Sequence, residues 1–267
     1  MPDWIALILF VVVPAALTVV VHVLVRRVIP PEKLSPHHEV AGFLVAVIGV
    51  MYAVVLGFVV VTVWTAFDTA QQTADLEAGY VADAFNLARA LPEPERTRVK
   101  RDLAAYAVQV RDVEFQTMGD GVQDPQAFGR LADAVRTMLA MPPAQGTLGQ
   151  VLRGQSRYEA VVSAIRQVAD TRRLRFIEAR SKLPRAMYLA LILGGLMVLV
   201  FVFLFGVESG AIQLTMTATV AGCIGLLIGL VVEFNAPYSG AIRVTPEAWT
   251  LVIDGNHFAD VASGRLR

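Results

Sequence analysis

The sequence has few cysteines and histidines, the residues that form disulfides and bind many structural metal ions. Its 267 residues include one cysteine, Cys223, and four histidines. One chain therefore cannot contain a disulfide framework or a cysteine-based metal site. The motifs G-x-S-x-G, H-E-x-x-H and C-x-x-C and the P-loop are missing too, and these mark many catalytic and phosphate-binding sites. We expect a protein that is not an enzyme and that has no cofactor and no bound metal.

Charge is also scarce and unevenly spread. Only 17% of the residues are charged and 55% are hydrophobic, which departs from the composition of ordinary soluble proteins. Of the 46 charged residues, 31 lie between Asp68 and Lys182, sixteen of them basic and fifteen acidic. The net charge is zero, so no basic surface dominates. This excludes nucleic acid as an expected partner.

Four apolar runs are long enough to cross a bilayer: residues 4–25, 40–67, 186–207 and 211–232. The second contains 28 residues without a formal charge. At about 1.5 Å per residue it outreaches the roughly 30 Å hydrocarbon core. Only three residues, 208–210, separate the third and fourth runs, so these two must return antiparallel to each other.

This pattern predicts an all-α, polytopic membrane protein with four transmembrane helices and a central helical cytoplasmic domain. The predicted parts are a first transmembrane hairpin (1–67), a helical soluble domain (68–183), a second transmembrane hairpin (184–234) and a C-terminal tail (235–267). The lipid bilayer is thus one partner. Seven basic residues flank the domain side of the spans and three flank the other, which places the N-terminus, the central domain and the tail in the cytoplasm.

Apolar residues at helical spacing predict four helices in the soluble domain. The second span continues to about Leu91, and further helices cover about 93–118, 126–140 and 147–182. The residues expected to face inward include Val110 and Val113 in the second of these helices and, in the third, Phe128, Leu131, Val135 and Leu139.

Two spans carry stripes of small residues. They are Gly42, Ala46, Gly49, Ala53 and Gly57 in the second span and Gly222, Gly225 and Gly229 in the fourth. Small residues let another helix approach closely, and such packing replaces in lipid the hydrophobic drive that operates in water. We expect both stripes to be helix-packing surfaces, and the alternative for the second span is a pore wall.

Three ionisable residues at the membrane boundaries are candidates for gating or pH sensing: His37, His38 and Glu233. Imidazole titrates near neutrality, and a carboxylate at the end of a glycine stripe tends to face a helix bundle or a wet cavity. The alternative is that all three are solvated at the headgroups. Adjacent histidines on a helix do not converge on one metal ion.

Two groups of charges in the central block have structural interpretations. Glu77 and Asp83 are placed to pair with Arg172, Arg173 or Arg175 if the first and last helices of the domain are antiparallel. Such pairs fix helix register, and exposed ones contribute about 0–1 kcal/mol. Asp120 and Asp124 lack the alternating ligands of a calcium loop, so we expect a simple turn there.

Several segments of the sequence resemble landmarks of one family. They are AGFLVAVIGVMYAVVLGFVVVTVW, LARALPEPER, ARSKLP and APYSG. These segments are similar to those of the bestrophin-like family of bacterial membrane proteins, over about residues 26–247. The resemblance implies a distant similarity to bestrophins, which are oligomeric anion channels with four membrane helices per subunit and a helical cytosolic domain. Asn235 departs from the family pattern, because an acidic residue is expected before the Pro-Tyr-Ser-Gly turn.

Two functions remain open at this point. The first is a homo-oligomeric ion channel of the bacterial cytoplasmic membrane, anion-selective by analogy, whose pore is surrounded by copies of the second span. Its partners would be other copies of the chain and small inorganic ions. The pore-lining candidates are Phe43, Val47, Val54 and Phe58, because apolar pore walls can gate by dewetting. The second is a non-conducting membrane scaffold or sensor whose cytoplasmic domain binds a partner.

Overall fold

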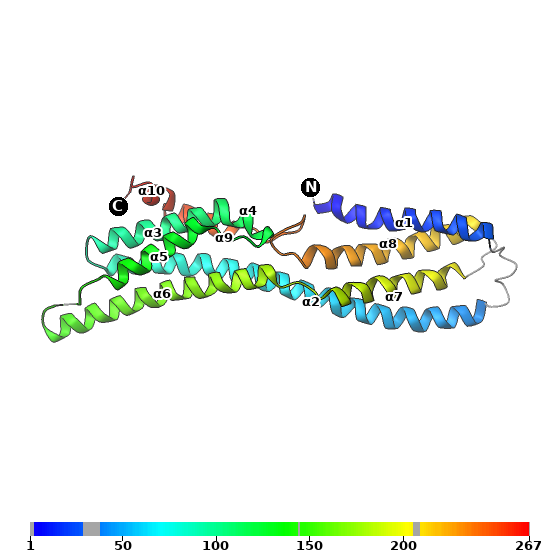
Figure 1. The fold of residues 1–267 in the computed structure, drawn as a ribbon, viewed down its shortest axis with the longest axis horizontal. Coiled ribbons are helices and arrows are strands. Elements are labelled where there is room, and N and C mark those ends of the chain that lie inside the picture. Colours follow the sequence, from blue (N-terminus) through cyan, green and yellow to red (C-terminus); the bar gives the residue numbers. More distant parts are fainter. Residues whose placement is uncertain (1–2, 29–37, 144, 205–208, 267) are drawn as a thin grey trace. The chain divides into compact units, whose positions relative to one another are not determined.

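A computed structural model describes residues 3–28, 38–143, 145–204 and 209–266, and every regular element in these ranges is a helix (Figure 1). The chain forms two compact units. The membrane unit contains Met1–Ala66, Lys182–Asn235 and Gly240–Ile242. The soluble unit contains Phe67–Ser181, Ala236–Ser239 and Arg243–Arg267.

Four helices are long and apolar enough to cross a membrane. They are α1 (Asp3–Val28), α2 (His38–Leu87), α7 (Arg185–Phe203) and α8 (Gly210–Phe234). The prediction of four spans is therefore confirmed. The third helix ends at Phe203, and the expected remainder of that span up to residue 207 lies almost wholly outside the described residues.

Helix α2 is much longer than a membrane span. It has 50 residues, or about 75 Å at 1.5 Å per residue, which is more than twice the hydrocarbon core. The apolar residues fill its first half, and its second half is part of the soluble unit. The prediction that the second span continues as a helix well past its apolar residues is confirmed, and a 3-10 turn, η3 (Ala88–Ala90), ends it.

Glycine brings α1 and α8 into backbone contact. A methyl group at Gly222 would lie 3.2 Å from Val11 Cγ1, and one at Gly225 would overlap the Phe10 carbonyl oxygen and the Pro14 ring. Pro14 has no N–H to donate to the carbonyl four residues earlier, which is that of Phe10. The missing side chain at Gly225 leaves room for this carbonyl. Gly229 likewise faces the Phe10 ring.

A second close approach joins α2 and α7. The ring of Tyr52 in α2 covers Gly194 and Gly195 in α7, and a methyl group at Gly195 would lie 3.0 Å from the Tyr52 hydroxyl oxygen. The outward faces of the four helices are apolar, as expected of surfaces that meet lipid.

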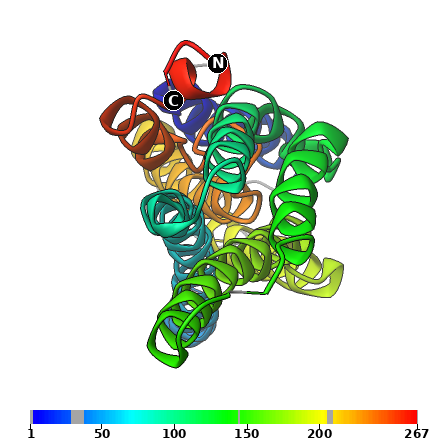
Figure 2. The same cartoon turned by 90° about the vertical axis from the view of Figure 1, so that its left-hand side faces the viewer.

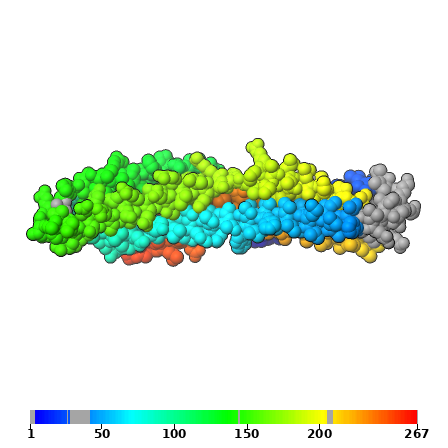
Figure 3. Space-filling view, turned by 90° about the horizontal axis from the view of Figure 1, so that it is seen from below, coloured from blue at the N-terminus to red at the C-terminus, as the bar shows by residue number. Residues whose placement is uncertain are grey.

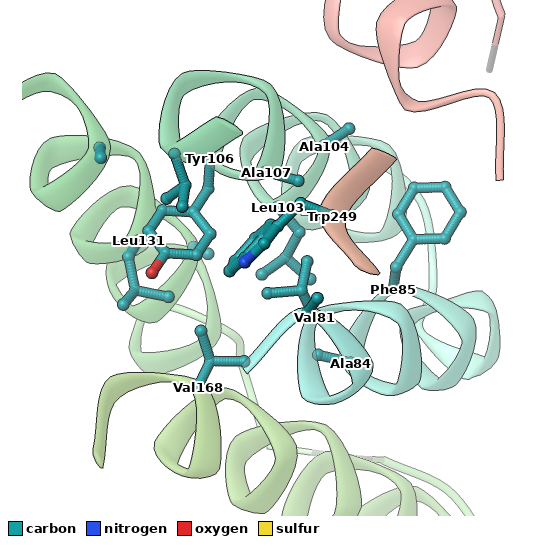
Figure 4. Close-up of a cluster of buried hydrophobic side chains, with 14 of the residues drawn as sticks. Val81, Ala84, Phe85, Leu103, Ala104, Tyr106, Ala107, Leu131, Val168 and Trp249 are labelled. Carbon is teal, nitrogen blue, oxygen red and sulfur yellow. The ribbon is translucent and has the colours of Figure 1, made fainter. Parts of the chain in front are cut away.

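The soluble unit is a helical bundle around one core (Figure 2). Its elements after α2 and η3 are α3 (Glu95–Gln109), a π-helical turn η4 (Val110–Glu114), α4 (Phe115–Thr117), η5 (Met118–Asp120), α5 (Pro125–Leu139), α6 (Leu148–Arg180), α9 (Glu247–Gly255) and α10 (Phe258–Ala262). Trp249 of α9 lies at the centre, beside Leu103 and Tyr106 of α3 and Val81 of α2 (Figure 4). The tail of the sequence thus completes the core of this unit.

The inward face predicted for the third soluble helix is wrong at three of four positions. Leu131 is buried, but Phe128, Val135 and Leu139 are exposed, and Leu139 keeps 71% of its surface. The buried positions of α5 are Ala127, Leu131, Ala134 and Met138. Alanine lets a neighbouring helix approach closely, so α5 packs through its alanine positions. Three of its larger apolar side chains face outward instead. Asp124 begins this helix by accepting hydrogen bonds from the backbone N–H groups of Gln126 and Ala127.

The glycine contact gives a test of the membrane unit. We expect Gly225→Ala to lower the stability of the protein by about 1–3 kcal/mol, because the new methyl group meets backbone that cannot rotate away. Gly79→Ala is the matched control, since Gly79 is an exposed helical glycine of α2 outside the small-residue stripe and a methyl group there meets nothing within 4 Å. Thermal unfolding of both variants in detergent measures the difference. Equal melting temperatures would contradict the backbone contact.

Candidate functional site

The pore-lining candidates lie on one exposed face of α2. Phe43, Val47, Val54 and Phe58 are all exposed, with Phe43 keeping 69% and Phe58 72% of their surface. At about 100° per residue, the four lie within an arc of about 60°. This part of α2, blue in the space-filling view, lies on the surface (Figure 3). The opposite side of α2 is buried through Leu56, Val59 and Val63.

The small-residue stripe of α2 is open. A methyl group added at Gly49 or Gly57 would meet no atom within 4 Å. Ala46 and Ala53 are exposed, and Gly42 is half-buried. The stripe precedes the apolar face by one residue, so the two are about 100° apart around the helix. Unlike the glycines of α8, Gly49 and Gly57 therefore face no other described helix closely.

The three gating candidates have different positions. His37 lies outside the described residues, and His38 begins α2 but its side chain is not described. Glu233 is buried in the last turn of α8. Its Oε2 accepts hydrogen bonds from the backbone N–H groups of Ala241 (2.9 Å) and Ile242 (3.2 Å). Gly240, at φ +92°, leaves room for the carboxylate. Glu233 therefore holds the segment that follows α8.

Asn235 ends α8 in place of the acidic residue that the family pattern implies. Its Oδ1 accepts a hydrogen bond from the backbone N–H of Leu183 at 2.6 Å. Leu183 lies two residues before α7 begins at Arg185, so this bond ties together the two ends of the second hairpin. A side-chain carbonyl performs this role without a charge.

A charge cluster is buried in the soluble unit. Arg175 Nε lies 2.6 Å from Glu77 Oε2, and its Nη2 lies 2.5 Å from Glu114 Oε1. Arg172 Nη2 lies 2.6 Å from Glu114 Oε2. Glu77, Glu114 and Arg175 have no exposed surface, and the Tyr106 hydroxyl donates to Glu77. The cluster joins α2, α3, η4 and α6, and its two cations balance its two carboxylates.

The π-helical turn η4 determines which side chains surround Arg175. A π turn contains one residue more than an α turn, so the residues after it are shifted by about 100° around the axis. Phe115 and Met118 thereby become buried beside Glu114, while Val113 is exposed. The Arg175 guanidinium lies 5.3 Å from the Phe115 ring centre and 6.0 Å from that of Trp249. The prediction that Val113 faces inward is wrong for this reason.

Burial controls the ionisation of the cluster. It raises the pKa of Glu77, against the opposing effect of the Arg175 cation and the Tyr106 hydrogen bond. It also raises the pKa of Tyr106 well above its ordinary value, and Glu77 adds to this rise. For Arg175 burial disfavours the charge, but Glu77, Tyr106 and Glu114 outweigh it and raise its pKa. Arg175 therefore remains a cation.

A model of the bestrophin-like domain matches residues 12–249, which is most of the sequence. The chain belongs to the bestrophin-like family. No curated protein matches the sequence.

Solved structures share the bestrophin-like fold at low sequence identity. Two crystal structures of mutants of a bacterial bestrophin homologue from Klebsiella pneumoniae are 12% and 14% identical to the chain, with TM-scores of 0.64 and 0.59. They cover 95% and 94% of this chain and 99% and 98% of their own. A crystal structure described as a membrane protein is 14% identical, has a TM-score of 0.62, and covers 95% of this chain and 98% of its own. At these identities the likeness shows the fold alone.

Only some of the expected ion pairs form in this bestrophin-like chain. Glu77 meets Arg175, but Asp83 is exposed, and Arg173 pairs with Asp170 on the surface at 3.5 Å. Glu114 was missed by sequence reasoning. Its signal was its spacing of four residues from the buried Val110, which places it on the apolar face of its helix. In the described residues, no group of three or more His, Cys, Asp or Glu is placed to hold a metal ion.

Two neighbouring arginines of α6 test the cluster. We expect Arg175→Ala to cost about 3–5 kcal/mol of stability, because it leaves two carboxylates buried without their shared cation. Arg173→Ala removes an exposed pair and should cost about 0–1 kcal/mol. Thermal unfolding of the purified variants gives both values. If Arg175→Ala were as stable as Arg173→Ala, the cluster would not hold the bundle together.

A half-buried carboxylate predicts a pH effect. Glu178 accepts a hydrogen bond from the Thr73 hydroxyl at 2.9 Å, and burial raises its pKa. Its contribution to stability is therefore complete below its unfolded pKa of 4.5 and is lost as the pH rises through the higher folded value. We expect Glu178→Gln to raise the melting temperature at pH 7.5, and the gain to vanish near pH 4. Glu159→Gln, at an exposed position of α6, is the control. A gain that is equal at both pH values would refute the assignment.

Proposed function

We propose that this protein is a homo-oligomeric ion channel of the bacterial cytoplasmic membrane, with its pore lined by the first half of α2. Membership of the bestrophin-like family and the shared fold support this proposal. The observation that carries it is the uncharged face of α2 from Phe43 to Phe58, which no other part of the described chain covers.

The geometry of α2 suits a ring of identical helices. Its small-residue stripe and its apolar face are about 100° apart. In a ring, each helix turns one such side toward its neighbour and the other toward the axis. Gly49 and Gly57 permit close approach between neighbours. Phe43, Val47, Val54 and Phe58 then form apolar constrictions, which close a pore by excluding water.

The same proposal includes the selectivity of the channel for ions and the orientation of the chain in the membrane. By analogy with the bestrophins the permeant ions are anions, an argument at the level of fold. The excess of basic residues on the domain side of the spans supports a cytoplasmic N-terminus, soluble unit and tail. Glu233, His37 and His38 remain candidates for gating, and for Glu233 the hydrogen bonds to Ala241 and Ile242 would carry the effect into the segment that follows α8.

A second candidate function is a non-conducting scaffold or sensor. It is favoured by large apolar side chains on the surface of the soluble unit, where Leu139 and Leu148 keep 71% and 76% of their surface. Such side chains mark interaction sites when they cluster. A sealed transmembrane bundle would support this alternative, and a water-filled path along the symmetry axis would exclude it.

Ion flux from liposomes that contain the purified protein tests the channel. We expect the protein to conduct, and Phe58→Ala to increase flux because it widens an apolar constriction. Leu193→Ala is the control, since Leu193 is an exposed residue of α7, which the proposal turns toward lipid. Reversal potentials in a KCl gradient then distinguish anions from cations.

Because the chain has a single cysteine, the flux experiment can also be done by cysteine modification. In a Cys223→Ser background, a charged thiol reagent that cannot cross membranes should block flux through Phe58→Cys but not through Leu193→Cys. Protein that carried no flux at any pH or voltage would overturn the proposal. Equal modification of both positions would overturn the assignment of α2 to the pore.

A further inference from the structure

A cavity of about 1050 Å³ lies within the soluble unit. Three segments form its walls: the end of η3 with the start of α3, the connection between α5 and α6, and the first half of α6. Its volume is at the upper end of the range of small-molecule sites. Neither the exposed face of α2 in the membrane unit nor the buried charge cluster contributes to its lining.

The charge of the cavity is positive. Arg89, Arg96 and Arg157 line it, against a single acidic residue, Glu159. Arg96 pairs with Glu93 at 2.6 Å. Arg89 and Arg157 form no ion pair with any residue that the structure describes. Two guanidinium groups thus remain available to a ligand.

Lys100 reports the local positive field. Burial lowers the pKa of its ammonium group, and Arg89 and Arg96 lower it further. Three cations, Lys100, Arg89 and Arg96, therefore lie close enough together to repel one another, and only Glu93 opposes them at Lys100. Such crowding is relieved by an anion.

The rest of the cavity lining is mostly apolar and includes one aromatic ring. Leu91 is buried beneath the cavity, and Met141, Val151 and the Tyr158 ring are half-buried along it. Gln155 also lines the cavity, where its amide donates to Glu159 at 3.0 Å. A tyrosine ring offers a stacking surface for a planar group, and guanidinium groups bind phosphates through paired hydrogen bonds.

We propose that this cavity binds an organic anion that joins phosphate groups to a planar ring, as a nucleotide does. Arg89 and Arg157 bind the phosphates, and Tyr158 stacks on the ring. The assignment uses only the soluble unit and does not depend on ion conduction. A protein that conducts nothing can therefore still bind the ligand, and the two proposals fail separately.

Calorimetric titration of the full chain in nanodiscs tests the site, with ADP, pyrophosphate and adenosine as probes. We expect ADP to bind more tightly than pyrophosphate, and adenosine to bind least. Arg89→Gln and Arg157→Gln should each weaken ADP binding by about tenfold or more, as loss of a charged hydrogen bond does. Both side chains are exposed, so the variants should fold, and thermal unfolding checks this.

Two further variants make the result specific. Arg166→Gln is the matched control, because Arg166 is an exposed arginine of α6 outside the cavity, and it should leave ADP binding unchanged. Tyr158→Leu should weaken ADP but not pyrophosphate. The proposal is overturned if neither phosphate compound binds, if Arg166→Gln weakens binding as much as Arg157→Gln, or if an acidic peptide binds more tightly than ADP.

Discussion

The soluble unit depends on one buried cation, Arg175. A guanidinium group without exposed surface is tolerated only if carboxylates and hydrogen bonds replace its water. Here α2 supplies one carboxylate and the π-helical turn supplies the other. Apolar side chains alone would allow these helices several similar arrangements. The pairing of Arg175 with both Glu77 and Glu114 is compatible with one register only, because sliding any helix by a turn would leave a charge buried alone.

The helices of the membrane unit are held together by close contacts at small residues, whereas buried charges hold the helices of the soluble unit. Lipid tails are as apolar as the side chains, so the hydrophobic effect does not drive these membrane helices together. Close van der Waals packing between the helices has to do so instead. The glycines of α8 bring it against α1, and Gly194 and Gly195 receive Tyr52. Both contacts lie within one chain. The open stripe of α2 uses the same residue types, which is the physical basis for expecting other copies there.

The sequence was most informative where one property dominates over many residues. Uncharged runs predicted four spans, and turns with proline and glycine predicted where helices end. The family followed from short segments of sequence. The faces of the soluble helices were harder to predict, because the size of an apolar side chain suggested burial whereas alanine was what allowed α5 to approach its neighbours. Glu114 was missed because only apolar residues were used to predict the inward face of its helix, although its spacing from Val110 placed it inside.

The π-helical turn has an evolutionary consequence. Five residues occupy a stretch that an ordinary helix would fill with about four, as if one residue had been inserted into α3. Loss of that residue would restore regular winding and would carry Phe115 and Met118 out of the core together. A relative with a one-residue deletion at this place would therefore need a different set of neighbours for its arginine. The length of this segment, more than its hydrophobicity, should distinguish chains that share the buried charge cluster from chains that lack it.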